Sequence, residues 1–460
     1  MSVDRKSILT CSGEDRSGTI RDAISVLESG ISAVLPETVL KRGLEWSSRT
    51  DSLTIGDHLL ELDHGRLFVI GAGKSAGAMA LAFERIVGPD RVMWGWVNSI
   101  RQTDPNPVSI TIHPAGHPLP DEDSLAGTRA MLDTLLGFHL VRTDHVIVLL
   151  SGGASAMLCQ PQEPVTLQDK IELTGRLIRS GGDIASINCV RKHLSMVKGG
   201  KLGRLLSPAT VVTMCISDVE GDRPEVIGSG PTVSDESTPE DAIAVLWHHN
   251  IWTDAPDSVR RLLMSTESIR RAAPDYLDRC RHHILAGTGD ACEAMREKAG
   301  TLGYRAWVDG DYLRGDPDQA SQRIAGAIRQ MARRGGDALI WGGEVTPHVV
   351  DCGGTGGRLQ HLMLTLLSRT DGLGESWVIA GAASDGCDYT KGVAGAWIET
   401  NPGERHGEDP IILDHLARFD SGSYFRNIRA GLILSGETGT NVADLIVCLR
   451  KRQGGSRHDT

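Results

Sequence analysis

Short apolar runs recur along the chain, and each is followed by a glycine-rich turn and then by a helical pattern. Residues 67–70 (Leu-Phe-Val-Ile) predict a strand, and residues 75–86 predict the helix that follows it. Residues 145–150 and 209–217 predict two further strands, the first followed by two glycines and the second ending in acidic residues. Strands that alternate with helices are typical of a mostly parallel sheet covered by helices. The predicted fold class is therefore α/β.

The alternation stops at residues 248–275, where prolines and weak periodicity predict a connection between domains. A second series of elements follows, with strands expected at 282–286, 337–341, 377–381 and 431–435 and helices at 290–302 and 358–369. Since 460 residues exceed one ordinary domain, we predict two α/β domains, at 1–255 and 275–452. The first includes a helical lead-in over 17–46, and the tail 453–460 is expected to be frayed.

Composition narrows the classes of partner and the compartment. The formal net charge of −11 argues against nucleic acid or an anionic membrane surface as a general partner. No apolar run approaches the roughly 20 residues of a membrane-spanning helix, and the mixed charges of residues 1–6 do not resemble a secretory signal. The nine cysteines are scattered without a C-x-x-C pair, which is typical of reduced thiols in a cytoplasm.

The first turn with candidate chemistry is segment 71–76 (Gly-Ala-Gly-Lys-Ser-Ala), which follows a strand and opens a helix. Glycines there let backbone N–H groups approach an anion, so Gly71 and Gly73 are candidate nucleotide contacts and Lys74 stands at the lip. The P-loop pattern fails because Phe68 occupies the position of its first glycine. The looser dinucleotide pattern G-x-G-x-x-A fits, but no acid follows at the ribose-binding distance. A tight turn with a solvated lysine is the alternative.

The second turn is segment 151–155 (Ser-Gly-Gly-Ala-Ser), again after a strand. Its glycines and hydroxyls suit a turn whose N–H groups wrap a phosphate. The residues predicted to contact the nucleotide are Ser151, Gly152, Gly153 and Ser155. A plain turn is the alternative, and a serine nucleophile elbow is absent because Met157 replaces its last glycine.

The segment 188–201 places four cations within eleven positions. Such a concentration is costly unless the cations face an anion or carboxylates, although a solvated helix face is equally compatible. Arg191 and Lys198 are the predicted substrate contacts. Acidic residues follow at 217–222, where the end of a strand predicts a ligand edge. Asp218 and Asp222 are therefore candidate Mg²⁺ ligands, with a turn cap before the proline as the alternative role of the second.

Four of the five residues at 353–357 are glycines, and Arg358 follows at the start of a predicted helix. An arginine at this positive end of the helix dipole is unfavourable by roughly 0.3–1 kcal/mol, which predicts an anion beside it. The polar turns 384–388 and 437–442 each follow a strand and are individually more typical of structure than of catalysis. Within the first of them, Asp385 is a candidate substrate contact.

Taken in order, these segments resemble the glycerate 2-kinase family, whose regions are often called the N-terminal glycerate-kinase domain and the MOFRL domain. The matching segments cover nearly the whole chain and lie at 73–76, 117–121, 150–156, 188–193, 198–200, 217–222, 229–232, 342–344, 356–358 and 438–442. The resemblance implies a Rossmann-like N-terminal domain, a smaller mixed-sheet C-terminal domain and an interdomain cleft.

The resemblance also implies a reaction and two catalytic residues. The family phosphorylates D-glycerate at its 2-hydroxyl with ATP and Mg²⁺, giving 2-phosphoglycerate. Its motif lysine and arginine correspond to Lys74 and Arg358, which the resemblance places at the substrate and the travelling phosphoryl group. The implied partners are a nucleotide and a small sugar acid, and a homodimer is one expected assembly.

The chain departs from the family pattern at several positions. Leu359 and His361 replace an asparagine and a glutamate, Gly392 replaces an acid after a new Lys391, and Ala154 replaces a glycine. These changes leave open a related acceptor, such as a longer aldonate or a branched analogue. Two other classes also stay open, namely a hydroxypyruvate reductase using NAD(P) and a non-catalytic sugar-acid binding protein.

Overall fold

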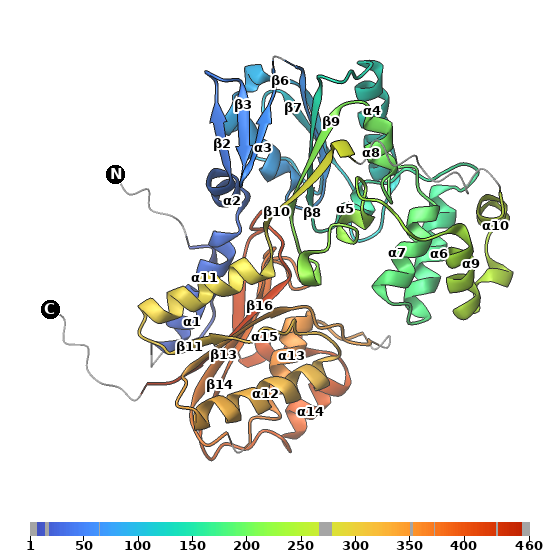
Figure 1. Cartoon of the computed structure of the whole chain (residues 1–460). Helices are drawn as coiled ribbons and strands as arrows, with labels where there is room; N and C mark the ends of the chain where they lie inside the picture. Colours follow the sequence, from blue (N-terminus) through green and yellow to red (C-terminus); the bar gives the residue numbers. More distant parts are fainter. Residues whose placement is uncertain are drawn as a thin grey trace. The chain divides into compact units, whose positions relative to one another are not determined.

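The computed structural model describes residues 7–13, 18–63, 65–265, 278–349, 353–371, 373–428 and 431–452. Its internal contacts divide the chain into two compact units (Figure 1). Pro36–Leu285 forms the first, named here the parallel-sheet unit. Met1–Leu35 and Ala286–Thr460 together form the second, named here the mixed-sheet unit.

The parallel-sheet unit is built on a six-stranded sheet in the order β10-β9-β8-β5-β6-β7. Its strands are β5 (Leu67–Ala72), β6 (Val92–Ser99), β7 (Ile110–Pro114), β8 (His145–Ser151), β9 (Thr210–Ile216) and β10 (Cys280–Ala286). The five strands from β9 to β7 in this order pair in parallel. Every residue of β5 and β8 is buried, as expected for continuous apolar strands covered on both faces.

The parallel-sheet unit also contains helices and a small separate antiparallel sheet. The helices are α2 (Pro36–Gly43), α3 (Ala76–Val87), α4 (Glu122–Gly137), α5 (Ala154–Met157), α6 (Leu167–Arg179), α7 (Ile184–His193), α8 (Lys201–Leu206), α9 (Pro239–His248) and α10 (Asp257–Leu263). The small sheet contains β2 (Leu44–Ser47), β3 (Ser52–Ile55) and β4 (His58–Glu61). Helices α6, α7, α9 and α10 gather around an apolar cluster of their own (Figure 1).

The mixed-sheet unit contains a seven-stranded sheet in the order β1-β15-β14-β13-β16-β12-β11. Its strands are β1 (Leu9–Cys11), β11 (Ala306–Val308), β12 (Ala338–Gly343), β13 (Trp377–Ala383), β14 (Val393–Thr400), β15 (Leu432–Ser435) and β16 (Asp444–Arg450). Only β11 and β12 pair in parallel among these described strands. The core of this unit includes the fully buried side chains of Trp341 and Trp377.

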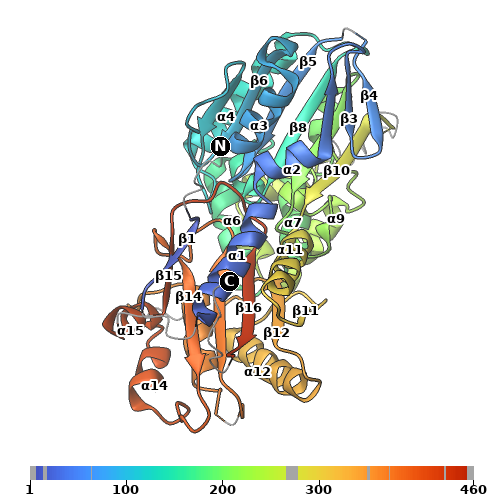
Figure 2. The ribbon, with the colours of Figure 1, turned by 90° about the vertical axis from the view of Figure 1, so that its left-hand side faces the viewer.

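The helices of the mixed-sheet unit pack in pairs. They are α1 (Thr19–Ala33), α11 (Thr288–Thr301), α12 (Pro317–Arg333), α13 (Arg358–Leu367), α14 (Pro410–Ala417) and α15 (Ser421–Ile428). Helix α1 lies beside α11 and β16 (Figure 2). The packing of α1 on α11 is so close that a Cβ on Gly30 would lie 2.7 Å from Cγ of Met295.

The predicted strands and helices are confirmed as elements, and the fold class is α/β with one parallel and one mixed sheet. The division of the chain differs from the predicted domains in two respects. Helix α1 belongs to the second unit, because its apolar face packs on α11 and β16 rather than on the first sheet. The boundary between the units falls at 285/286, after the predicted connection. The predicted frayed tail lies outside the described residues.

Several elements were not predicted, namely β14, β16, β6, the edge strand β7 and the small sheet. Among the described residues, no single helix has the length and apolar character of a membrane span; only the bent pair α1–α2 meets that test, and only jointly.

Candidate active site

The two glycine turns of the parallel-sheet unit are locked together by hydrogen bonds. The Lys74 N–H donates to the Gly152 carbonyl (2.8 Å), and the Ser75 N–H donates to Oγ of Ser151 (2.9 Å). Gly73 has φ +136°, and a Cβ there would lie 2.3 Å from that same Oγ. Gly73 and Ser151 are therefore required for the packing of one turn on the other.

This packing corrects one prediction about the first turn. Gly73 N–H donates to the Asn98 carbonyl and Ala76 N–H to the Gly73 carbonyl, so every N–H from residue 73 to 76 already has an acceptor within the protein. Gly71 is needed because a Cβ there would lie 2.2 Å from the Leu149 carbonyl oxygen on β8. The N–H groups of the first turn therefore form no phosphate cradle.

The second turn differs from the first. Among the residues that the structure describes, the N–H groups of Gly152 and Gly153 have no backbone or side-chain acceptor. Gly153 has φ +84°, and a Cβ there would lie 3.4 Å from Cγ of Lys74 and 2.9 Å from Cδ2 of His117. The Lys74 side chain thus runs alongside this turn, and the prediction that the turn holds phosphate groups remains a prediction.

Next to this turn lies a cavity of about 170 Å³, named here the cation pocket. It is lined by His117, Pro118, Leu119, Pro120, Gly153, Ser155, Ala156, Lys170, Ile171, Thr174 and Arg191. Lys170 is only 3% exposed, and its Nζ lies 3.5 Å from Sγ of Cys159. Lys198 is fully buried behind the pocket and donates to the Gly228 carbonyl (3.1 Å).

Burial determines the electrostatics of this pocket. Loss of solvation lowers the pKa of Lys170, of Arg191 and, most strongly, of Lys198. Repulsion from Lys170 and Arg191 lowers the pKa of Lys198 further. Within the described residues, none of these three cations forms an ion pair with a carboxylate. The pocket therefore brings together basic groups for which the described residues supply no carboxylate.

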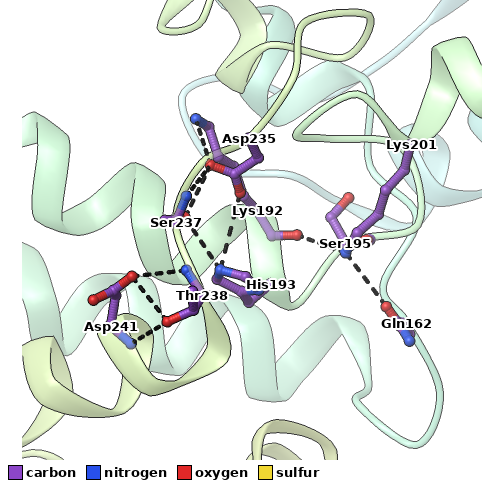
Figure 3. Close-up of polar contacts among 9 residues, drawn as sticks. All are labelled: Gln162, Lys192, His193, Ser195, Lys201, Asp235, Ser237, Thr238 and Asp241. Carbon is purple, nitrogen blue, oxygen red and sulfur yellow. Dashed lines mark hydrogen bonds and ion pairs between the residues drawn. The ribbon is translucent and has the colours of Figure 1, made fainter. Parts of the chain in front are cut away.

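The rest of the basic segment has partners inside the protein (Figure 3). Lys192 Nζ lies 3.2 Å from Oδ1 of Asp235, and His193 Nε2 lies 3.1 Å from Oγ of Ser237. Lys201 Nζ donates to the carbonyls of Lys192 (2.9 Å) and Ser195 at the end of α7 (Figure 3). Burial lowers the pKa of Lys201 to about 8. Lys192, His193 and Lys201 therefore all have polar partners within the protein.

The acidic turn follows β9. Asp218 is half-buried there, and Asp222 ends the short 3₁₀ turn Glu220–Asp222 with φ 51°. The described residues contain no group of three or more His, Cys, Asp or Glu side chains placed to hold a metal. Two carboxylates fit Mg²⁺ all the same, because this ion commonly takes one or two protein carboxylates together with substrate phosphates and water. The donor chemistry of the turn thus matches the predicted ion.

In the mixed-sheet unit, Arg358 begins α13 and is surrounded by acids. Its Nε and Nη2 donate to the two carboxylate oxygens of Asp444 (2.6 and 2.9 Å), and its Nη1 lies 2.7 Å from Oε1 of Glu344. Asp388 accepts hydrogen bonds from the first N–H groups of the helix, those of Leu359 and Gln360 (both 3.0 Å). We call Glu344, Arg358, Asp388 and Asp444 the arginine–carboxylate cluster. The anion predicted beside Arg358 is therefore present within the protein.

Burial shifts the acids of this cluster. It raises the pKa of Asp444 to about 6 although Arg358 opposes the shift, and it raises the pKa of Asp388. Burial opposes the charge of Arg358 itself, but Asp444 and Glu344 outweigh it and raise the pKa of the guanidinium. The cluster therefore contains one firmly charged cation and two acids with a raised pKa, Asp388 and Asp444.

A cavity of about 540 Å³ opens beside the cluster. It is lined by Glu344, Val345, Thr346, Pro347, Val349, Gly353, Gly354, Gly356, Gly357, Arg358, His361, Asp388, Tyr389, Phe419 and Ser421. His361 stacks on Phe419 with ring centres 4.9 Å apart, and loss of solvation lowers the pKa of its imidazole. The cavity is large enough for a ligand of nucleotide size.

The structure separates the remaining candidates in this unit. Asp385 does not line the cavity, and its carboxylate accepts the Cys387 N–H (3.0 Å) within its own turn. Leu359 is fully buried in the core, so this departure from the family pattern points away from any ligand. His361 does line the cavity, whereas Gly392 lies exposed with φ 84°.

Lys170 is not among the site residues predicted from the sequence, although its position in the helical pattern distinguishes it. Helix α6 buries Leu167, Leu173, Thr174 and Leu177, and Lys170 falls on the same stripe. A lysine on an apolar stripe is unusual, because a buried ammonium loses its solvation. The acids that pair with Arg358 left no comparable signal, because they lie far from it along the chain.

Comparisons with known proteins agree with this architecture. Residues 22–264 match the family described as a domain of unknown function, DUF4147, and residues 337–444 match the MOFRL family. These two families define a class of two-part α/β proteins. A D-glycerate 2-kinase from Thermotoga maritima is 33% identical over 93% of this chain and 97% of its own length. The chain belongs to the glycerate 2-kinase family.

Two further relatives refine the comparison. The crystal structure of a glycerate kinase from Thermotoga maritima matches with a TM-score of 0.76 and 31% identity, over 94% of this chain and 99% of its own. A protein named putative hydroxypyruvate reductase from Agrobacterium vitis is 35% identical over 87% of this chain and 90% of its own length. The comparisons therefore establish the fold and the family. The names of the two relatives describe different reactions, a kinase reaction for the first and a reductase reaction for the second.

Proposed function

We propose that this protein transfers the γ-phosphoryl group of ATP to the 2-hydroxyl of D-glycerate, giving 2-phosphoglycerate and ADP. The observation that carries the proposal is the cation pocket beside Lys74 and the second glycine turn. Phosphoryl transfer requires the positioning and neutralisation of anions more than covalent chemistry. The names of the relatives support the same reaction.

In this proposal the residues of the site bind or neutralise the negative charge of the phosphate groups. The unpaired N–H groups of Gly152 and Gly153 receive phosphate oxygens. Lys74 neutralises the travelling phosphoryl group as the acceptor hydroxyl loses its proton to solvent, its oxygen bonds to phosphorus, and the bond from phosphorus to the ADP oxygen breaks. Asp218 and Asp222 hold Mg²⁺ directly or through water. When bound, this ion offsets the negative charge of the phosphates. Arg358 remains a predicted catalytic residue that acts from the mixed-sheet unit.

The alternative reaction is reduction of hydroxypyruvate, which the name of the Agrobacterium vitis relative suggests. A dinucleotide fold binds pyrophosphate through N–H groups at its first glycine turn. Here those N–H groups are used inside the protein, so the geometry favours the kinase.

The test is an assay of the pure protein with ATP, Mg²⁺ and D-glycerate, in which ADP release and 2-phosphoglycerate are both measured. Turnover that depends on D-glycerate supports the proposal. NADH oxidation with hydroxypyruvate and no ADP release would replace it with the reductase, and binding of D-glycerate without either reaction would indicate a binding protein.

The metal assignment has its own test. Asp218→Asn removes a charged oxygen ligand, so the Mg²⁺ concentration for half-maximal activity should rise about tenfold or more, equivalent to roughly 1.4 kcal/mol. A Mg²⁺ titration identical to that of the wild type would exclude Asp218 as a ligand.

A further inference from the structure

The cation pocket differs from every other cluster of charges described here in its missing counter-ion. Lys170 contacts a thiol, Lys198 contacts a carbonyl oxygen, and Arg191 forms no ion pair within the described residues. One residue further along α7, Lys192 has its carboxylate in Asp235. Burial alone favours the uncharged form of the Lys170 and Lys198 amines, so an anion from outside the protein would both hold them in the charged form and supply the carboxylate-like partner that the described residues lack.

The size of the pocket limits this anion. A volume of about 170 Å³ corresponds to roughly six water molecules at about 30 Å³ each. It lies below the roughly 300–1,000 Å³ of pockets that take drug-sized ligands. A nucleotide is too large for it, whereas a three-carbon acid fits. Pro118, Leu119, Pro120 and Ile171 form an apolar part of the wall, and the polar side chains, which include His117 and Thr174, form the rest.

The hydroxyl of Ser155 adds a second feature. Ser229 donates its hydroxyl proton to Oδ1 of Asn188 (3.0 Å), so the Ser155 hydroxyl donates to Oγ of Ser229 (2.9 Å). Ser155 therefore presents lone pairs to the pocket and accepts a hydrogen bond there. A hydroxyl group of a ligand satisfies it, whereas an ionised phosphate oxygen does not.

We propose that the cation pocket binds the carboxylate of the acceptor acid through Lys170 and Arg191, and that Ser155 accepts a hydrogen bond from a hydroxyl of the same molecule. This inference rests on the proposed kinase function and names the binding site of its acceptor. Lys198 supports the pocket from behind. The ligand class is a short hydroxy acid, and Ser155 serves the acceptor rather than the nucleotide.

The experiment compares D-glycerate with D-glyceramide, its uncharged amide, in three proteins. Lys170→Met keeps the length of the side chain and removes its charge, and Lys192→Met is the matched control on a neighbouring structural cation. In the wild type we expect the amide to lower kcat/KM on the order of 10–100-fold, as for a lost charge-assisted hydrogen bond. In Lys170→Met the KM for D-glycerate should rise by a similar factor, the preference over the amide should fall below about threefold, and the KM for ATP should stay within about twofold.

Two results would overturn the inference, namely equal use of the acid and the amide by the wild type, or identical kinetics in Lys170→Met and Lys192→Met. Arg191→Met, at the half-buried edge of the pocket, provides the same comparison if Lys170→Met does not fold. If the wild type releases no ADP with D-glycerate, calorimetric titration of D-glycerate separates the two proposals. Binding that Lys170→Met or Arg191→Met abolishes supports the pocket without the kinase reaction, and no binding to the wild type overturns the pocket.

Discussion

The cation pocket and the arginine–carboxylate cluster differ in whether acidic side chains accompany their basic side chains. The pocket gathers Lys170 and Arg191, with Lys198 close to both, and no acid pairs with them within the described residues, whereas the cluster surrounds Arg358 with Glu344, Asp388 and Asp444. Both lie beside glycine-rich turns, and both contain a cation that the sequence predicts to be functional. The comparison shows that two basic side chains in similar sequence contexts can differ in whether the protein supplies a carboxylate for them. We use the absence of such a carboxylate, rather than the sequence context, to identify candidate ligand-binding cations.

The sequence correctly predicts that Arg358 requires a nearby anion, but it does not show which residues supply that anion. An arginine at a helix N-terminus needs a nearby anion. The fold supplies three, one of which, Asp388, also receives the first N–H groups of α13. Arg358 still lines a cavity, so both a structural and a catalytic role are testable.

The largest expected effect belongs to Lys74, which lies beside the second glycine turn. Lys74→Ala should lower kcat/KM on the order of 10³-fold, because cationic clamps on a transferring phosphoryl group have effects of this size. The melting temperature should move by no more than a few degrees, because the side chain is only half-buried. Steady-state kinetics and a thermal melt measure both. A loss below about tenfold would remove Lys74 from the reaction.

Arg358→Ala should instead damage the fold. Removal of this cation leaves the buried Asp444 without its partner, which costs roughly 3–5 kcal/mol when one member of a buried pair is lost. We expect the melting temperature to fall by roughly 10 °C. The double variant Arg358→Met with Asp444→Asn should recover most of this loss, because neither charge then remains buried alone. A wild-type melt with abolished turnover would instead make Arg358 a ligand-binding cation.

The sequence predicted the local part of this picture. Strands β5 and β8 are continuous apolar runs, and the glycine turns after them are visible without a structure. Distant pairings are not visible. Asp444 pairs with Arg358 across 86 positions, and α1 packs with elements far along the chain, so no local pattern encodes either contact. For the same reason the sequence could not divide the basic segment into Arg191, which faces the pocket, and Lys192, which faces Asp235.

The pH dependence of stability tests the ionisation of Asp444 in the arginine–carboxylate cluster. Burial raises the pKa of Asp444 from 3.8 to about 6, so the folded state binds more protons than the unfolded state between these values. The stability that Asp444 contributes is full below about pH 4 and is lost as the pH rises through 6. Asp444→Asn mimics the protonated acid, so the free energy of unfolding of the variant relative to the wild type should shift in favour of the variant by roughly 1–3 kcal/mol between pH 4 and pH 7. Urea unfolding of both proteins at each pH measures this difference. A difference independent of pH would mean that the carboxyl group ionises as readily in the folded state as in the unfolded one.

The smallest expected effect separates the two faces of α7. Asp235→Asn removes the charge that Lys192 faces. Both side chains are largely buried (11% exposed for Lys192 and 14% for Asp235), but the amide can still accept a hydrogen bond, so the free energy of unfolding should fall by roughly 1–2 kcal/mol. The KM for the acceptor acid should remain unchanged, because Asp235 acts on Lys192 and His193, whose contacts lie outside the cation pocket. Urea unfolding and the acceptor KM test the two halves of this statement. If the KM rose tenfold, Lys192 would belong to the ligand site as well, and an internal carboxylate would no longer distinguish a structural cation from one that awaits a substrate.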